Sequence, residues 1–194
     1  MAKESQKFPN CPLLRFKGFK DEWQEVELKD VCEIKKGKQL NRSCFIDDGK
    51  YYVMNGGTKP SGYYDEYNTL GNTITISQGG SCGYVCYHKK PFWCGGDAFK
   101  LISKTNTKQN QLYYYLYYYL KNNEPSLTKL AYGTSIKHIS QKDIIKISII
   151  LPSFKEQTKI ANFLNLLDQI INLEQTLLNN YDKQKKYFFN QLLC

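Results

Sequence analysis

The sequence lacks any long uninterrupted run of apolar residues. A membrane-spanning helix needs about 20 such residues, so we predict no membrane span and no membrane partner. The first residues, Met1 to Ser5, also lack the apolar core of a secretory signal peptide. We therefore expect a cytoplasmic protein whose seven cysteines are reduced thiols.

Motifs for nucleotide binding and catalysis are missing as well. The sequence contains no Gly-x-x-x-x-Gly-Lys-Ser/Thr loop and no Gly-x-Gly-x-x-Gly fingerprint. It also lacks the Asn-Pro-Pro-Tyr or Asp-Pro-Pro-Tyr tetrapeptide of amino-methyltransferases. His88 and His138 are the only histidines, and no serine or cysteine nucleophile has an obvious base among them. We expect no catalytic residue and no cofactor in this chain.

Two kinds of metal chemistry stay open as alternatives. Glu33 and Lys35, with Asp21 or Asp30 upstream, fit the carboxylates and lysine of a small Mg²⁺-dependent nuclease. A set of potential zinc ligands also falls within thirteen residues, but it contains no Cys-x-x-Cys knuckle, so buried thiols are the favoured interpretation. The potential zinc ligands are Cys82, Cys86, His88 and Cys94.

Positive charge is concentrated in the first three quarters of the chain, which carries a net charge of +9. Residues 1–150 hold 22 Lys and Arg against 14 Asp and Glu, a balance of +8. Residues 151–194 hold 5 against 4, a balance of +1. A basic globular region favours a polyanionic partner, and nucleic acid is the usual one.

Residues 1–150 show the pattern of an α+β domain rich in strands. Leu112, Leu116 and Leu120 recur at helical spacing and predict a helix over residues 109–121. We expect its leucines to face the core and its tyrosines to cover the rim, with a base-stacking platform as the alternative. Alternating and β-branched residues predict strands at residues 51–54, 73–77, 83–87 and 98–102.

Polar loops between these elements carry side chains that usually contact DNA. Lys and Arg bind phosphates, Gln and Asn recognise adenine, and Ser and Thr bind either. One polar loop alone is usually just solvated, but five of them on a basic domain favour DNA binding. The predicted DNA-binding residues are Lys36, Lys38, Arg42, Lys59, Ser61, Tyr63, Gln78, Ser81, Lys89, Lys90, Thr134, Ser135, Lys137 and His138.

The last forty-odd residues predict one long helix, because no proline or glycine occurs from Ser153 to Cys194. Ser153 and Glu156 have the spacing of a capping box, in which each side chain accepts a hydrogen bond from a backbone N–H of the first turn. At 1.5 Å per residue the helix would span about 60 Å, more than a domain of this size needs.

Apolar residues in this helix recur at steps of four and three, close to the coiled-coil period. Glu174 and Lys185 interrupt the series, and polar residues in a seam can fix register and orientation at a cost in stability. A helix folded back on its own domain is the alternative to self-association. The residues predicted to contact a partner helix are Ile160, Leu164, Leu167, Ile171, Leu178, Tyr181, Phe188 and Leu192.

These segments resemble a known family. The stretch from Leu151 to Ala161, with the long helix after it, resembles the end of a target recognition domain and the following helix of a type I restriction-modification specificity subunit. Arg15 to Phe19 with Trp23 resembles the start of such a repeat. Asn55–Tyr63 and Gly133–Ser140 are similar to patterns within these domains. The resemblance covers nearly the whole chain and depends on order and spacing.

The resemblance implies a mixed, β-rich DNA target recognition domain at residues 1–150 and a coiled-coil spacer helix at residues 151–194. It implies a non-catalytic subunit that binds double-stranded DNA and docks modification subunits. Those subunits carry S-adenosylmethionine and methylate adenine, and through them the complex includes a restriction subunit. Family members usually have two recognition domains and two spacer helices in one chain, whereas this sequence has one of each.

A single recognition domain leaves three alternatives open: a full functional subunit, a half-subunit that dimerises, or a fragment of a two-domain subunit. We expect the half-subunit. Two copies with antiparallel helices would present identical domains to one face of the DNA. The expected target is two identical half-sites in inverted orientation, separated by an unread gap whose length the helix sets. A small Mg²⁺-dependent nuclease and a purely structural coiled-coil adaptor remain the alternatives.

Overall fold

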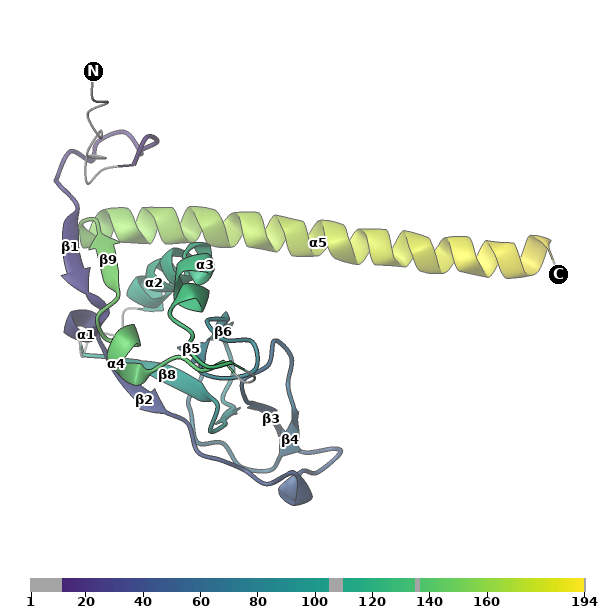
Figure 1. The fold of residues 1–194 in the computed structure, drawn as a ribbon. Coiled ribbons are helices and arrows are strands. Elements are labelled where there is room, and N and C mark those ends of the chain that lie inside the picture. The colour runs from purple at the N-terminus through teal and green to yellow at the C-terminus, as the bar shows by residue number, and fades with distance from the viewer. Residues whose placement is uncertain (1–11, 105–109, 135–136, 194) are drawn as a thin grey trace.

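The computed structural model describes residues 12–104, 110–134 and 137–193. It consists of a β-rich domain and one long helix, α5 (Phe154–Leu192), which projects from one end of the domain (Figure 1). The predicted α+β class with a long C-terminal helix is therefore confirmed. Within the described residues, no helix is both long and apolar enough to cross a membrane.

The strands of the described residues form three small sheets. β1 pairs with β9, the largest sheet has the order β2-β8-β5-β6, and the third has the order β4-β3-β7. All pairings are antiparallel except the one between β3 and β7. The bounds are β1 Gln24–Glu27, β2 Cys32–Lys36, β3 Tyr51–Met54, β4 Gly62–Tyr64, β5 Thr73–Ser77, β6 Val85–His88, β7 Trp93–Cys94, β8 Ala98–Ser103 and β9 Ser148–Leu151.

Short helices connect and cover these sheets. The four strands expected from local pattern correspond to β3, β5, β6 and β8. β3 and β5 have the expected bounds, β6 begins two residues later and ends one residue later, and β8 ends one residue later. The helix predicted over residues 109–121 is α2 and starts and ends one residue later than expected. The helices before α5 are α1 Leu28–Val31, η1 Arg42–Cys44, α2 Asn110–Asn122, α3 Glu124–Lys129 and α4 Gln141–Ile144.

The main core lies between the four-stranded sheet and α2. Ile74 and Ile76 of β5 are fully buried, and Leu116 and Leu120 of α2 are buried with them. Tyr115 is the most buried of the α2 tyrosines in the described part of the helix, and the others cover its flanks at intermediate exposure. The interpretation of α2 as a core helix with a tyrosine rim is thus confirmed for Leu116 and Leu120, while the side chain of Leu112 lies outside the described residues.

The opposite side of α2 supports the start of α5, so α2 lies between the sheet and the long helix (Figure 1). The Tyr118 hydroxyl donates to Asp168 Oδ2 at 2.7 Å, and the Tyr115 hydroxyl donates to the Ile150 carbonyl at 2.7 Å. Beyond Asp168, every described residue of α5 is exposed. The alternative of a helix folded back on its own domain is therefore wrong for most of the length of α5.

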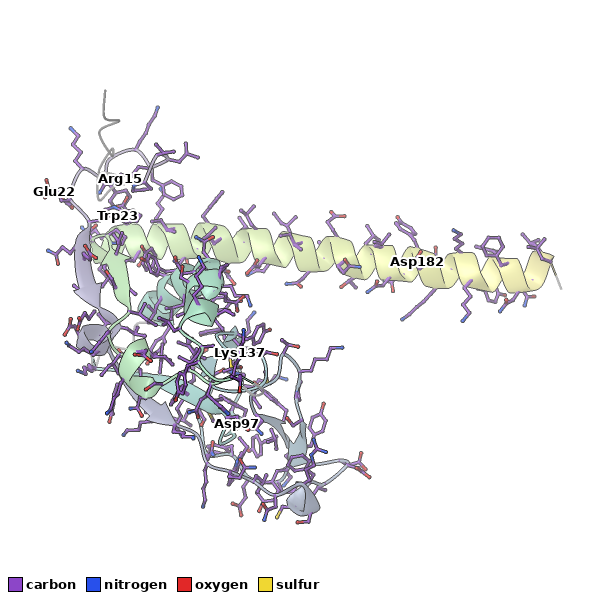
Figure 2. All side chains as sticks on the ribbon, in the orientation of Figure 1. Arg15, Glu22, Trp23, Asp97, Lys137 and Asp182 are labelled. Atoms are coloured by element: carbon purple, nitrogen blue, oxygen red, sulfur yellow. The ribbon has the colours of Figure 1, made fainter. Side chains whose placement is uncertain are left out.

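The expected capping box at the start of α5 is also wrong. Ser153 is the N-cap residue, but its side chain makes no capping hydrogen bond. Glu156 is fully buried and points to the entry segment, where Arg15 Nε and Nη2 donate to its two carboxylate oxygens at 2.7 Å each. Trp23 Nε1 donates to the same carboxylate at 3.2 Å. These bonds join the beginning of the described chain to the start of α5, beside which Figure 2 labels Arg15 and Trp23.

Candidate nucleic-acid interface

Loops from four parts of the chain meet where β5 and β3 end. Ser81 N donates to the Gly56 carbonyl at 2.8 Å, which joins the loop after β5 to the loop after β3. Gln78 N donates to the Asp97 carbonyl at 2.8 Å, and Ile139 N donates to the Gln78 carbonyl at 2.9 Å. We call the described residues 55–61, 78–82, 95–97, 132–134 and 137–138 the loop junction.

Glycines allow the backbones of the loop junction to approach closely. A Cβ atom on Gly56 would lie 2.2 Å from the Gly79 carbonyl oxygen, too close for any side chain. Gly80 has a φ of +66°, a left-handed conformation that favours glycine. Because backbone N–H and C=O groups bond across the junction, the loops hold one another in place and present their side chains on a defined scaffold.

Several predicted DNA-binding residues lie at this junction. Gln78 and Ser81 belong to it, and His138 packs beside Gly79, where a Cβ would be 3.1 Å from the imidazole ring. Lys137 is exposed, and its carbonyl accepts a hydrogen bond from Cys82 Sγ at 2.8 Å. Thr134 is exposed on the loop that the Tyr132–His138 bridge closes, whereas Ser135 lies outside the described residues.

Exposed basic residues flank the junction. Lys36 ends β2 opposite Phe99, and Lys38 N donates to the Cys94 carbonyl at 2.9 Å, beside the 95–97 loop. Lys59 is exposed on the loop after β3. Lys137 and Asp97 are labelled in Figure 2, in the part of the domain that lies below α5 in this view. The junction can therefore offer cations to phosphates and amides, hydroxyls and imidazole to base edges.

Most of the remaining predicted residues lie elsewhere. β5 and β6 are antiparallel, with Thr73 opposite His88, so Lys89 and Lys90 lie at the end of this hairpin away from the junction. The predicted DNA-binding residues therefore lie in more than one part of the domain. Arg42 and Tyr63 lie around η1 and β4, where Ile46 N donates to the Tyr63 carbonyl at 3.0 Å. Ser61 is the last residue of the junction loop after β3 and directly precedes β4. All three residues are exposed.

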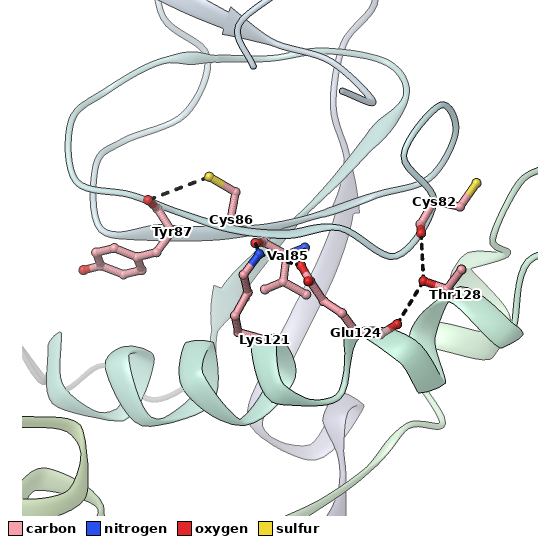
Figure 3. A network of polar contacts seen from close by, with 7 residues as sticks. All are labelled: Cys82, Val85, Cys86, Tyr87, Lys121, Glu124 and Thr128. Atoms are coloured by element: carbon pink, nitrogen blue, oxygen red, sulfur yellow. Dashed lines mark hydrogen bonds and ion pairs between the residues drawn. The ribbon is translucent and has the colours of Figure 1, made fainter. Parts of the chain in front are cut away.

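A lysine and a glutamate occupy the free edge of β6, next to the junction (Figure 3). Glu124 Oε1 accepts hydrogen bonds from Val85 N at 2.6 Å and from Lys121 Nζ at 2.7 Å. Lys121 Nζ also donates to the Val85 carbonyl at 3.1 Å. Thr128 Oγ1 donates to the Cys82 carbonyl at 3.2 Å. These bonds satisfy an edge strand that would otherwise expose its backbone, and they attach the loop before it to α3.

Sequence reasoning missed two polar residues of the junction. Asn55 Oδ1 accepts from Asp97 N at 2.9 Å, and Asn55 Nδ2 donates to Asp97 Oδ2 at 3.3 Å. The pair ties the loop after β3 to the loop before β8. Asn55 precedes two glycines, a pattern that indicates a turn. Its partner Asp97 is 42 residues away in the sequence, so no local pattern identifies the contact.

The four potential zinc ligands do not form a metal site. Both ring nitrogens of His88 are occupied, Nδ1 by the Tyr52 hydroxyl at 2.9 Å and Nε2 by Thr75 Oγ1 at 2.8 Å. Cys94 is buried in the second, smaller core. No group of three or more His, Cys, Asp or Glu suited to a metal ion occurs in the described part of the chain. The cysteines within that part, Cys32, Cys44, Cys82, Cys86 and Cys94, are free thiols.

The residues of the nuclease alternative do not form a metal-binding site in the described structure. Glu33 and Lys35 are exposed on β2, and their side chains pair with each other at 3.1 Å. Asp30 Oδ2 accepts a hydrogen bond from Glu27 N at 3.0 Å and so caps the short helix α1. The carboxylates and the lysine are thus used in local contacts.

The burial of His88 predicts an acid-sensitive fold. Its side chain is 2% exposed, and burial lowers its pKa from 6.5 to about 4. Between these values the unfolded chain binds a proton that the folded chain does not, so stability should fall as the pH drops from 6.5 towards 4, by about 3 kcal/mol in full. Urea unfolding of a His138→Gln variant from pH 7.5 to 4.5 measures this slope.

The control removes the remaining histidine. Carboxylates also titrate in this range, so adding His88→Gln to the His138→Gln variant separates their contribution from that of His88. We expect the double variant to lose the pH dependence of unfolding free energy between pH 6.5 and 5. An unchanged slope in that interval would mean that His88 is protonated in the folded protein.

The predicted helix seam is partly occupied by the domain. Ile160 and Leu164 are half-buried near Trp23, Tyr115 and Tyr118. The other six seam residues are 40–77% exposed although they are large and apolar. They are Leu167, Ile171, Leu178, Tyr181, Phe188 and Leu192. An apolar stripe of this length on a projecting helix is typical of an interaction surface.

Comparison with known proteins agrees with this architecture. A family model described as the type I restriction modification DNA specificity domain matches residues 20–180. A chain of Mycoplasma pneumoniae named as a type I specificity subunit is 36% identical over 167 residues, covering 85% of this chain and 44% of that protein. A type I specificity subunit of Mycoplasma genitalium is 33% identical over 173 residues, covering 88% and 44%.

Solved structures show the same fold. The crystal structure of a type I restriction-modification system S subunit from M. genitalium matches with a TM-score of 0.78 and 30% identity, over 95% of this chain and 48% of that one. The HsdS subunit of Thermoanaerobacter tengcongensis matches with a TM-score of 0.58 at 21% identity, over 80% and 39%, a likeness of fold alone. The chain therefore spans about half the length of the relatives it matches.

The basic, β-rich domain with its projecting helix thus belongs to the class of DNA specificity domains. More narrowly, the chain belongs to the type I restriction-modification DNA specificity family. This confirms the resemblance inferred from the sequence. The relatives are named as specificity subunits, which also confirms that the chain is not itself an enzyme.

Proposed function

We propose that this chain acts as half of a type I specificity subunit, which dimerises through α5 and binds double-stranded DNA through the loop junction. Residues 1–150 form the target recognition domain and residues 151–194 the spacer. The observation that carries the proposal is the exposed apolar seam of α5. The chain spans about half the length of its relatives, and a second copy adds a second recognition domain and a second helix to the assembly.

The basic character of the domain supports the DNA-binding part of the proposal. Residues 1–150 hold nearly all of the excess positive charge, and Lys36, Lys38, Lys59 and Lys137 are exposed at or beside the junction. Lysines bind phosphates without regard to sequence, whereas amides and hydroxyls such as those of Gln78 can discriminate base edges. The junction combines both kinds of group.

The exposure of α5 supports the dimer. Ile171 is 64% exposed, Leu178 is 53% exposed and Leu192 is 77% exposed, and these side chains share the seam face. Large exposed apolar surfaces are unusual on a chain that stays monomeric in water. A two-fold axis across α5 buries the same stripe on both copies and places one recognition domain at each end.

The proposed target follows from this symmetry. Two identical recognition domains related by a two-fold axis contact two identical half-sites in inverted orientation. Each domain joins its own helix at the α5 start, so the paired helices set the length of the unread gap between the half-sites.

A second apolar stripe on α5 is available for the modification subunits. It lies beside the seam, towards the first half of the helix, and its members are 43–67% exposed. A dimer that buries the seam leaves most of this stripe uncovered, so the two surfaces can serve different partners. The members of the stripe are Phe163, Leu166, Ile170, Leu173 and Leu177.

Replacing Lys59 or Lys137 with alanine is expected to weaken DNA binding without changing the oligomeric state. A lost phosphate contact should reduce the slope of log affinity against log salt by about 1. Gel-shift titrations over a range of salt concentrations measure this slope, and light scattering measures the mass. Lys146→Ala is the matched control, because Lys146 is exposed between α4 and β9, away from the junction.

The same titrations separate the proposal from its alternatives. A structural coiled-coil adaptor would show no DNA affinity even at low salt. A nuclease would cut DNA when Mg²⁺ is added and would lose this activity in Glu33→Ala. Binding without Mg²⁺-dependent cutting, with equal losses in Lys59→Ala and in the Lys146→Ala control, would place the contacts outside the junction.

A further inference from the structure

We infer that Glu174 of one copy faces Lys185 of a second copy, and that this reciprocal pair sets the direction and register of the α5 dimer. The inference rests on the proposed function, because it assumes that α5 self-associates. It explains why two charged residues interrupt an otherwise apolar seam.

The spacing of the seam is the same in both directions. From Leu167 to Leu192 the steps are four, three, four, three, four, three and four. A second helix that runs antiparallel, with its two-fold axis between Asn179 and Asn180, therefore places every seam residue opposite another seam residue. The apolar pairs are Leu167 with Leu192, Ile171 with Phe188, and Leu178 with Tyr181.

The two polar positions are also related by this axis. Glu174 and Lys185 lie equally far from its centre, so each Glu174 faces the partner's Lys185, twice in the dimer. A parallel pair would instead place Glu174 against Glu174 and Lys185 against Lys185. Opposite charges stabilise the first arrangement and like charges oppose the second, so the pair selects the antiparallel direction.

The same pair opposes a slip of the helices. A shift of one heptad would place Glu174 opposite Leu178 or Leu192 of the partner, and Lys185 opposite Leu167 or Tyr181. Each shift would bury Glu174 and Lys185 against apolar residues with no opposite charge to pair with, which would make dimerisation less favourable. The register centred between Asn179 and Asn180 satisfies both charges.

Both charged side chains are free to pair with another copy. Glu174 and Lys185 are exposed, and neither makes an ion pair within the described residues. The Lys185 ammonium lies 5.6 Å from the centre of the Phe189 ring, beside the seam. Figure 2 shows the side chains of this part of α5, Asp182 among them, extending from a helix that no part of the domain covers.

The register also gives a spacing. Ala161, which is buried where α5 packs on the domain, would lie about 55 Å along the helices from the partner's Ala161, roughly 16 base pairs of B-DNA. In Figure 1 the domain extends from the α5 start in the direction in which α5 itself points. The loop junctions therefore lie closer together than the two Ala161 residues, and the half-site centres should be fewer than about 16 base pairs apart.

Charge reversal tests the inference in the full chain. Glu174→Lys and Lys185→Glu should each raise the dimer dissociation constant roughly tenfold or more, because each creates like-charged pairs. The double variant Glu174→Lys/Lys185→Glu restores opposite charges and should return to within about threefold of the wild type. Sedimentation equilibrium measures the three constants. Lys183→Glu makes the same charge change on the other side of the helix and serves as the control.

Cysteine cross-linking tests the direction independently. In a background with Cys44 and Cys194 changed to serine, Leu167→Cys and Leu192→Cys should form disulfide-linked dimers when the two variants are mixed, but not separately. Linkage of each variant to itself would show a parallel pair and overturn the inference. A dimeric wild type whose double variant is not rescued would do so too, whereas a monomeric wild type would contradict the proposed dimer itself.

Discussion

Glu156→Ala is expected to lower the free energy of unfolding by about 3 kcal/mol, because it removes one partner of a buried ion pair. The Glu156 side chain is fully buried and accepts three hydrogen bonds, two from Arg15 and one from Trp23. Without it, the Arg15 guanidinium, whose side chain is 16% exposed, loses its carboxylate partner and keeps the Asp21 carbonyl at 2.6 Å, and the Trp23 indole N–H loses the Glu156 carboxylate. Urea unfolding followed by tryptophan fluorescence measures the change.

Two further variants make this prediction specific. Glu22→Ala removes an exposed carboxylate from the same entry segment (Figure 2) and should change stability by less than about 0.5 kcal/mol. Arg15→Met combined with Glu156→Leu replaces the pair with apolar side chains and should recover most of the loss. A loss below about 1 kcal/mol in Glu156→Ala would show that the entry segment is not held by this pair.

Leu178→Asp is expected to dissociate the dimer, raising its dissociation constant by about a thousandfold or more. Leu178 lies next to the centre of the seam, and the symmetric dimer would bury two unpaired carboxylates there. Light scattering over a range of concentrations should show a monomer with an unchanged circular dichroism spectrum. Thr176→Asp, on the opposite face of α5, should remain a dimer.

The dimer variant also separates the two parts of the function. Leu178→Asp leaves the loop junction intact, so binding to a single half-site should persist while binding to a paired site becomes weaker. If Leu178→Asp kept the mass of a dimer, the contact between copies would lie elsewhere and the seam would need another partner.

Local pattern predicted the elements of this fold well. Alternation and β-branching located β3, β5 and β8, and leucine spacing located α2 and its buried face. The uninterrupted length of α5 followed from the absence of proline and glycine, and its N-cap residue Ser153 from the spacing of Ser153 and Glu156. What failed was the role of Glu156, because its partner Arg15 is 141 residues away in sequence and competes with the local capping geometry.

The candidate site was predictable in composition but not in arrangement. Glycine and polar residues identified the loops after β3 and β5, and their meeting depends on the Ser81–Gly56 hydrogen bond, which no local signal encodes. The loop with Lys89 and Lys90 is polar and basic like the other loops, so its composition did not distinguish it from them. Only the β5–β6 register shows that they lie at the opposite end of the hairpin.

Two copies of this chain are proposed to place identical recognition domains on one DNA. Mapping methylated adenines in cells that express this chain with a modification subunit of its own system tests it most directly. We predict a bipartite motif with two identical, inverted halves and a fixed gap, which disappears with Leu178→Asp. An asymmetric motif, or one that persists in Leu178→Asp, would contradict the claim.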